Sequence, residues 1–166
     1  MHALPPDPPP IVGRASVIDG DTLEIRGQRI RLWGIDAPEG RQTCTRAGET
    51  YRCGTEAANY LDRQVKDRVV FCQPEGRPDR YRRIVAKCSF SLAGVQTSYE
   101  QGLDLGAAMV AAGWAVDFPR YSSGRYRVDQ AGAQRRRSGM WSGEFQMPWE
   151  WRGRARSAPT AAFASA

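Results

Sequence analysis

The sequence predicts an α+β domain in which helices pack against one barrel-like or sandwiched β-sheet. Short alternating segments dominate the first hundred residues, whereas helical patterns begin near Thr55 and recur after residue 104. A chain of 166 residues can bury a sizeable core and is most economically a single domain. Hydrophobic residues make up 41% and charged residues 25%, values that are ordinary for a globular domain.

Five segments carry the strand signal. In the second, Leu23 and Ile25 face one side while the polar residues between them face the other, as expected where a sheet buries one face. Arg26-Gly27-Gln28 follows and predicts a turn between two strands. The five expected strands cover about residues 14–18, 22–26, 29–33, 68–73 and 84–89.

Three helices are expected from apolar spacing of three and four residues. The first begins near Thr55, which we expect to be its N-cap. The second covers about residues 105–112, with Asp104 as its cap and Gly113 as its left-handed stop. The third covers roughly residues 125–137 and closes at Gly139.

The two ends differ in composition from the domain between them, which we place at residues 12–152. Residues 1–11 are expected to form a disordered, proline-rich leader, because consecutive prolines enter neither a helix nor a sheet interior. Residues 153–166 are expected to form a disordered tail of small residues. The segment Trp149-Glu150-Trp151-Arg152 either packs back on the sheet, which its paired tryptophans favour, or extends a nucleic-acid surface.

Net charge favours polyanionic partners. Lys and Arg number 24 against 18 Asp and Glu, which gives +6 and makes nucleic acid the first candidate, although such a charge is also a common solubility feature. No apolar run approaches the roughly 18 residues of a membrane span, so no membrane insertion is expected. We expect a monomer without an obligate protein partner.

The four cysteines predict two local disulfides, Cys44 with Cys53 and Cys72 with Cys88. Zinc is disfavoured, because there is no CxxC pair and the only histidine is His2. Four buried thiols are the alternative. The disulfide interpretation implies a periplasmic or secreted protein. Since the first residues lack a basic segment followed by an apolar stretch, we expect a signal peptide that has been removed or mis-assigned.

Asp19, Asp21 and Asp36 fall at the expected ends of neighbouring strands, which would bring them together. Gathered carboxylates repel one another unless a cation or a positive group offsets their charge. Oxygen ligands suit Ca²⁺ or Mg²⁺, and the lack of histidine argues against softer metals. The alternative is an ordinary turn, because Asp-Gly is a common turn dipeptide that needs no metal.

Three further side chains suit chemistry on a phosphate. Glu39 follows Pro38, whose restricted backbone would present the glutamate at a defined angle, as a water-orienting base requires. Arg31 and Arg83 are candidates for binding phosphate oxygens bidentately. Taken singly, each of these residues equally fits a solvated surface group.

Together the motifs resemble the staphylococcal-type nucleases, or thermonucleases, over about residues 14–145. Each motif alone is weak, and the specificity lies in their order. The motifs are Asp19-Gly20-Asp21-Thr22, Arg31-Leu32-Trp33-Gly34-Ile35-Asp36-Ala37-Pro38-Glu39, Cys53-Gly54-Thr55-Glu56-Ala57, Asp79-Arg80-Tyr81-Arg82-Arg83 and Gly139-Met140-Trp141. Exported bacterial members with a similar cysteine arrangement look much like this chain.

The resemblance implies an OB-fold, a five-stranded β-barrel with three α-helices, that hydrolyses DNA and RNA with Ca²⁺, Mg²⁺ being the other candidate. By the same resemblance, Asp21, Asp36 and the main-chain carbonyl of Ala37 bind the metal, and Asp19 supports metal-bound water.

The same likeness assigns the reaction to three side chains. Glu39 orients or deprotonates the attacking water, while Arg31 and Arg83 grip the scissile phosphate. Glu24 is expected to be an ordinary strand-surface residue.

Substrate-binding positions and departures follow from the same comparison of motifs. Arg80 and Tyr81 match residues that contact a terminal phosphate, and Tyr121 matches a base-stacking tyrosine. Ala37 replaces a threonine and Arg82 a glycine, so the turn before Arg83 is expected to differ. Two rival functions remain: a non-catalytic OB-fold module that binds nucleic acid or protein, and an exported domain that adheres to envelope polyanions.

Overall fold

The computed structural model describes residue 3 and residues 6–157. Its strands are β1 (Ile11–Arg14), β2 (Ser16–Asp19), β3 (Thr22–Ile25), β4 (Gln28–Leu32), β5 (Ile35–Asp36), β6 (Cys44–Arg46), β7 (Glu49–Tyr51), β8 (Val69–Pro74), β9 (Ile84–Phe90), β10 (Leu103–Asp104) and β11 (Val116–Asp117). Its α-helices are α1 (Cys53–Val65), α2 (Leu105–Ala111), α3 (Pro119–Ser122), α4 (Arg127–Arg136) and α5 (Pro148–Ser157).

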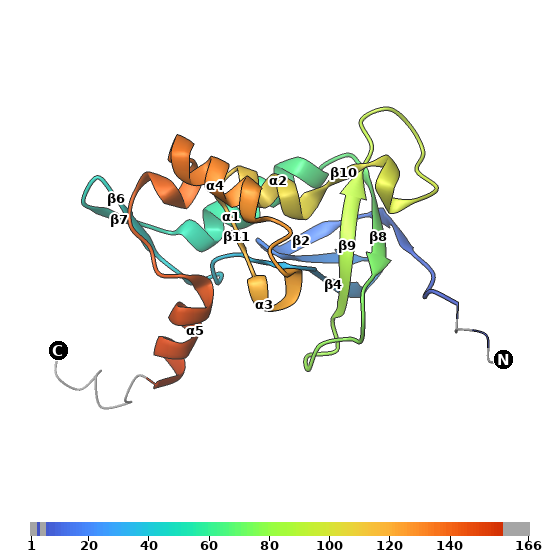
Figure 1. Cartoon of the computed structure of the whole chain (residues 1–166), viewed down its shortest axis with the longest axis horizontal. Helices are drawn as coiled ribbons and strands as arrows, with labels where there is room; N and C mark the ends of the chain where they lie inside the picture. The colour runs from blue at the N-terminus through green and yellow to red at the C-terminus, as the bar shows by residue number, and fades with distance from the viewer. Residues whose placement is uncertain (1–2, 4–5, 158–166) are drawn as a thin grey trace.

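The main sheet has the order β1-β8-β9-β4-β3-β2, with β10 beside β9, and curls around the core (Figure 1). Strands β4 and β9 are parallel, and the other neighbours in this sheet are antiparallel. The expected α+β fold is confirmed, and the five expected strands appear as β2, β3, β4, β8 and β9 within two residues of their predicted bounds. The short strands β1 and β10 extend the sheet beyond the prediction.

The hairpin between β3 and β4 sets the register of the strands that carry the candidate site. Ile25 pairs with Gln28 across a two-residue turn in which Arg26 (φ 48°) and Gly27 (φ 79°) are both left-handed. Two left-handed central residues make the type of turn whose twist matches that of the flanking strands. The predicted turn is therefore confirmed.

The helices correct three details of the prediction. Helix α1 begins at Cys53 with Arg52 as its N-cap, so Thr55 lies in the first turn and does not cap it. Helix α4 ends at Arg136, and its left-handed C-cap is Arg137 with φ 54°, two residues before the expected Gly139. A third detail is the number of helices, because α3 and α5 were not predicted.

Helix α2 forms as predicted, because Asp104 caps it and the amide of Ala107 donates to Asp104 Oδ2 over 2.8 Å.

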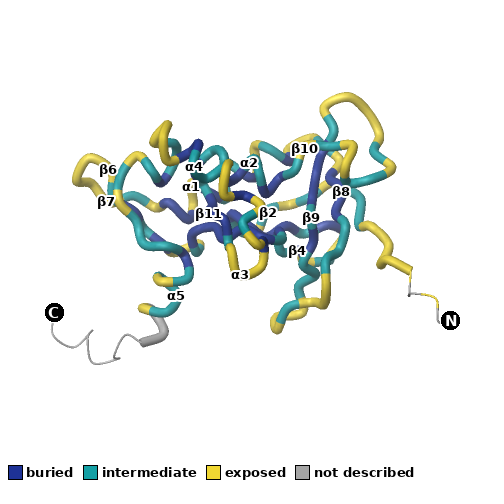
Figure 2. Tube along the Cα trace, viewed as in Figure 1, coloured by how far each residue is buried: buried dark blue, intermediate teal, exposed yellow. Residues whose placement is uncertain are grey.

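The core divides into two clusters. The larger fills the space between the curled sheet and helices α1 and α2, where the chain trace is mostly buried (Figure 2). The smaller contains Cys44, Cys53, Val116 and Met140, and Trp149 packs against it from α5.

Both predicted disulfides are present. Cys44–Cys53 joins β6 to the start of α1, and Cys72–Cys88 joins residues that pair directly across β8 and β9. These bridges are consistent with a protein outside the cytoplasm. None of the helices in the described part of the chain is long and apolar enough to cross a membrane.

The predicted ends of the domain need correction. Ile11, assigned to the leader, is the first residue of β1 and pairs with Cys72. Residues 153–157, assigned to a disordered tail, belong to α5. This helix has proline at its first position and stacks Trp149 on Phe118, with ring centroids 5.4 Å apart and an interplanar angle of 8°. The remainder of the predicted tail, 158–166, lies outside the described residues.

Candidate active site

Three aspartates gather where strand ends meet. Asp19 ends β2, Asp21 lies in the turn before β3, and Asp36 ends β5. The turn approaches its neighbours closely, because a Cβ at Gly20 would lie only 2.8 Å from the Cβ of Ala37. The Ala37 amide donates to Asp21 Oδ2 over 2.9 Å and ties the loop after β5 to this turn. The predicted ligand residues therefore lie together.

Arg31, on β4, bridges two of these acids. Its Nη1 lies 2.6 Å from Asp21 Oδ2, and its Nη2 lies 3.5 Å from Asp36 Oδ1 and donates to the carbonyl oxygen of Ile35 over 3.2 Å. Asp21 is 6% exposed and Asp36 fully buried, so the attraction is screened less than between surface charges. Arg31 therefore supplies part of the positive charge that the acids require.

The three carboxyl groups differ in acidity. Burial and the neighbouring Asp21 charge raise the pKa of Asp19 to about 7. Burial would raise the pKa of Asp21 as well, but the Arg31 guanidinium and several hydrogen bonds lower it to about 2. Burial raises the pKa of Asp36, although hydrogen bonds from Arg152 oppose this. Additional positive charge at the cluster would favour the ionised forms of Asp19 and Asp36.

Arg83 reaches the cluster from the loop between β8 and β9. Asp79 Oδ1 accepts from the amides of Tyr81 and Arg83, each over 2.9 Å, and Asp79 Oδ2 accepts from Arg83 Nε over 2.7 Å. Arg83 Nη1 then donates to Thr22 Oγ1 over 3.3 Å, and that hydroxyl donates to the carboxylate of the preceding residue over 3.2 Å. A short chain of hydrogen bonds therefore links Arg83 to Asp21.

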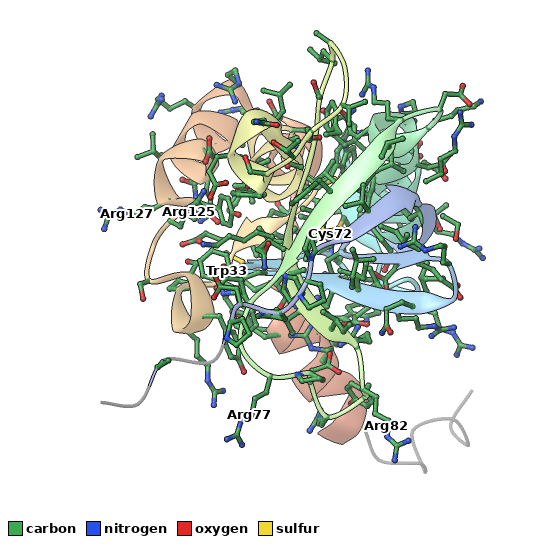
Figure 3. All side chains as sticks on the ribbon, turned by 90° about the vertical axis from the view of Figure 1, so that its right-hand side faces the viewer. Trp33, Cys72, Arg77, Arg82, Arg125 and Arg127 are labelled. Carbon is green, nitrogen blue, oxygen red and sulfur yellow. A yellow bond between two sulfur atoms is a disulfide. The ribbon has the colours of Figure 1, made fainter. Side chains whose placement is uncertain are left out.

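The turn that aims Arg83 keeps the backbone shape that a glycine favours. Arg82 adopts a left-handed φ of 64°, and its side chain is exposed and directed away from the domain (Figure 3). The arginine in place of glycine therefore changes the surface of the loop and leaves a left-handed residue before Arg83.

Glu39 lies at the rim of the cluster with its side chain 38% exposed. Its amide donates to Oε1 of the buried Gln42 over 3.2 Å, and Gln42 Nε2 donates to the carbonyl oxygen of Gln146 over 2.8 Å. Gly54 packs against the same loop, since a Cβ there would lie 1.9 Å from the Glu39 carbonyl oxygen. The backbone of Glu39 is thus held from two sides while its carboxylate reaches solvent.

Arg152, which the sequence did not assign to the site, contacts both Asp36 and Glu39. From α5 it donates to both oxygens of Asp36, Nη1 to Oδ1 over 2.9 Å and Nη2 to Oδ2 over 2.7 Å. Its Nη1 also donates to Glu39 Oε1 over 2.7 Å. These hydrogen bonds raise the pKa of Arg152 above its ordinary value, so the side chain is charged at any working pH.

Local sequence signals could have predicted α5 but not this contact. Pro148 at the first helical position and Glu150 in the first turn are common at helix starts. Arg152 and Asp36 are 116 residues apart, and no local pattern connects them. Of the two interpretations of this segment, packing is correct for Trp149, whereas Arg152 joins the acidic cluster.

The predicted substrate-binding residues lie in two places. Tyr81 is 65% exposed, and the guanidinium carbons of Arg80 and Arg83 lie 4.9 and 5.4 Å from its ring centroid. Tyr121 is 57% exposed, lies on α3, and meets Phe118 edge to face with centroids 5.0 Å apart. Arg80 and Tyr81 therefore adjoin Arg83, while Tyr121 adjoins the ring on which α5 stacks.

The acceptor groups at the cluster fit a hard divalent cation. They are carboxylate and carbonyl oxygens, the ligands that Ca²⁺ and Mg²⁺ prefer. Within the described part of the chain, no three or more His, Cys, Asp or Glu side chains form a ready-made metal cage. A cation here would be shared by Asp21, Asp36 and the carbonyl of Ala37, with water completing the coordination.

Comparison with known proteins identifies the family. A family model described as staphylococcal nuclease homologue matches residues 29–143, more than half of the chain. The chain belongs to this family. The resemblance read from the ordered motifs is thereby confirmed, and with it the OB-fold and a nuclease domain. Arg31, Asp36, Glu39 and Arg83 fall within the matched residues, whereas Asp21 precedes them.

Several curated proteins are similar to the chain. The succinoglycan biosynthesis protein ExoI of Rhizobium meliloti (strain 1021) is 40% identical over 134 residues, which cover 80% of this chain and 65% of that protein. The chain thus spans slightly less than two thirds of that relative. An uncharacterized endonuclease of Escherichia coli is 31% identical over 144 residues, covering 83% and 82% of the two chains. Protein ParB of Escherichia coli is 32% identical over 145 residues, covering 82% and 75%.

Proposed function

We propose that the protein is a metal-dependent phosphodiesterase that hydrolyses DNA and RNA with little sequence specificity. The observation that carries the proposal is the convergence of two arginines on one buried aspartate. Arg31 contacts Asp21 directly, and Arg83 reaches it through the Thr22 hydroxyl. An anionic phosphate would be drawn to the two guanidinium groups while the carboxylate stays available to a cation.

In this proposal the two arginines bind the scissile phosphate and offset the charge that develops in the transition state. Asp79 aligns Arg83 by accepting from both its amide and its Nε. A divalent cation, probed first as Ca²⁺ with Mg²⁺ as the alternative, would supply Lewis-acid stabilisation of phosphate charge when held by Asp21, Asp36 and the carbonyl of Ala37.

Glu39 acts on the attacking water. Its carboxylate is 38% exposed at the rim of the site, and its backbone is fixed by Gln42 and by the close approach of Gly54. A fixed carboxylate beside solvent can orient water and accept its proton. Asp19, whose pKa of about 7 reflects burial beside Asp21, supports the site through a hydrogen bond from the Asp21 amide.

Substrate contacts outside the reacting phosphate need no base-specific groups. Arg80 and Tyr81 are exposed beside Arg83 and suit a terminal phosphate, while the exposed ring of Tyr121 suits stacking on a base. The net charge of +6 favours approach of a polyanion.

We propose a monomer that acts in the periplasm or outside the cell, as the two disulfides favour. Titration of the unreduced protein should find no free thiol, and four free thiols would contradict this localisation.

A non-catalytic binding module is the second candidate, and one observation favours it. Arg152 already satisfies both oxygens of Asp36 and one oxygen of Glu39, as a purely structural ion cluster would. Degradation of denatured DNA and of RNA, each with Ca²⁺, with Mg²⁺ and with chelator, separates the candidates. We expect cleavage with a divalent cation and none with chelator, whereas binding without cleavage under every condition would establish the binding module.

A further inference from the structure

The position of Arg152 bears directly on how a cation reaches the site. Its guanidinium lies within hydrogen-bond distance of Asp36, a proposed ligand, and of Glu39, the proposed base. Both Asp36 oxygens accept from it, in the two-pronged geometry that makes arginine and carboxylate pairs strong. A divalent cation bound to the same carboxylate would face a second positive charge a few ångströms away, and low exposure strengthens that repulsion.

Helix α5, which carries Arg152, contacts the rest of the domain through Trp149 and through Arg152 itself. The helix projects from the body of the domain, below the sheet and apart from α1, α2 and α4 (Figure 1). Near its start, Trp149 stacks on Phe118 and packs against the smaller core cluster. Glu150 is exposed to solvent.

We propose that α5 gates the acidic site. The Arg152 guanidinium occupies the place of a cation beside Asp36 and Glu39, and it must leave both carboxylates before a divalent metal binds. The inference rests on the proposed function, because it concerns the same metal site. In the closed state Arg152 neutralises the ligand and the base together, which leaves the domain inactive without metal. Release of Arg152 frees Glu39 for water at the same moment as Asp36 becomes available to the cation.

The gate also explains why Arg31 and Arg152 approach the same aspartate differently. Arg31 lies on β4 within the main sheet and reaches Asp36 at 3.5 Å, whereas Arg152 makes the shorter contacts from α5. Only the second arginine can withdraw without disrupting the sheet. Arg31 therefore remains to bind phosphate after the gate opens.

Calcium binding measured by titration calorimetry tests the gate on the full chain. Arg152→Gln removes the competing charge and keeps a polar side chain, so we expect it to bind Ca²⁺ about tenfold more tightly than the unsubstituted protein, the effect of one lost charge-assisted competitor. Arg135→Gln is the matched control, because Arg135 is an exposed arginine on α4 and its loss changes the net charge equally. The control should bind Ca²⁺ as the unsubstituted protein does.

Hydrogen exchange of the unsubstituted protein provides a second measurement that needs no variant. Saturating Ca²⁺ should increase amide exchange in residues 148–157, because α5 loses its contacts with the site, and should leave α2 unchanged. Equal Ca²⁺ affinity of Arg152→Gln and the control, or Ca²⁺ binding that leaves exchange in α5 unaltered, would overturn the gate.

The failure of the gate differs from the failure of the proposed function. If the gate alone is wrong, Ca²⁺ still binds, Asp36→Asn still abolishes binding, and Arg152→Gln has no effect on affinity. If neither the unsubstituted protein nor Arg152→Gln binds Ca²⁺ or cleaves DNA, the metal-dependent function is wrong and the gate falls with it.

Discussion

Two groups of buried or half-buried carboxylates in this fold are hydrogen-bonded to different kinds of partner. At the candidate site, Asp21 and Asp36 face the guanidinium groups of Arg31 and Arg152. On the helical side of the molecule, Asp104 and Asp117 accept from neutral donors only among the hydrogen bonds found here, namely amides and hydroxyl groups.

The neutral donors belong to the elements that the carboxylates organise. Asp117 Oδ1 accepts from the hydroxyl of Ser122 over 2.5 Å and from the amide of Tyr126 over 3.2 Å. Asp104 accepts from the amide of Ala107 and from the hydroxyl of Tyr99. Such bonds fix turns and helix starts and cannot be exchanged without local unfolding. A guanidinium group, in contrast, can be replaced by another cation. A positively charged partner beside a carboxylate therefore indicates function better than the burial of that carboxylate does.

A large effect on catalysis is expected at Arg83. Replacing Arg83 by alanine removes one of the two arginines that converge on Asp21, and we expect turnover to fall by about 10² to 10³-fold, the scale of losing one preorganised stabilising group. The exposed Arg135→Ala variant is the matched control and should retain its activity. Cleavage rates on denatured DNA, with melting temperatures of all three proteins, measure the effect. Equal rates for Arg83→Ala and the control would remove Arg83 from the mechanism.

A smaller effect, on stability and not on chemistry, is expected at Asp117. Asp117→Ala leaves the Ser122 hydroxyl and the Tyr126 amide without their buried acceptor and should lower the free energy of unfolding by about 2–4 kcal/mol. Turnover measured well below the melting temperature should stay within about threefold of the unsubstituted protein, because the Asp117 carboxylate accepts from Ser122 and Tyr126, neither of which is proposed to contact the reacting phosphate. Chemical denaturation gives the first quantity. A large loss of turnover in a folded Asp117→Ala protein would mean that the two groups of carboxylates are coupled.

The smallest effect is expected at alkaline pH, from Tyr99 and Tyr126 beside Asp104. Burial and the hydrogen bonds with Asp104 raise the pKa values of Tyr99 and Tyr126 above the usual value near 10. Because the folded pKa exceeds the unfolded one, the contribution to stability is complete below about pH 10 and is lost as pH rises further. Melting temperatures at pH 9 and pH 11 should show this loss, and Tyr99→Phe should reduce it. If the melting temperature of Tyr99→Phe falls between pH 9 and pH 11 as much as that of the unsubstituted protein, the Tyr99 hydroxyl does not cause the loss.

Sequence patterns predicted the parts of the fold that depend on local chemistry. Alternation located β3 and β4, the segment Arg26-Gly27-Gln28 located their turn, and the Asp104 cap located α2. Thr55 was wrong as a cap because the start of α1 is set by close packing of Gly54 on the loop of Glu39. A contact between segments far apart in sequence overrides a local propensity there.

The candidate site was predictable to the extent that its residues lie in ordered motifs. Asp21, Arg31 and Asp36 come together because neighbouring strands and a short turn place them so. Arg152 was not predictable, since one of many arginines in a basic chain becomes significant only when α5 folds beside Asp36. The missed residue is the one that donates hydrogen bonds from α5 to both Asp36 and Glu39.

The rate of cleavage of denatured DNA by Glu39→Gln, in Ca²⁺ and at saturating substrate, tests the central claim most directly. Glu24→Gln is the matched control, because Glu24 is a half-buried residue of β3 with no proposed role in the reaction and the substitution makes the same change of charge. If Glu39 acts on the attacking water, Glu39→Gln should cleave about 10² to 10⁴-fold more slowly than Glu24→Gln while melting at a similar temperature. Equal cleavage rates for the two variants would contradict the account.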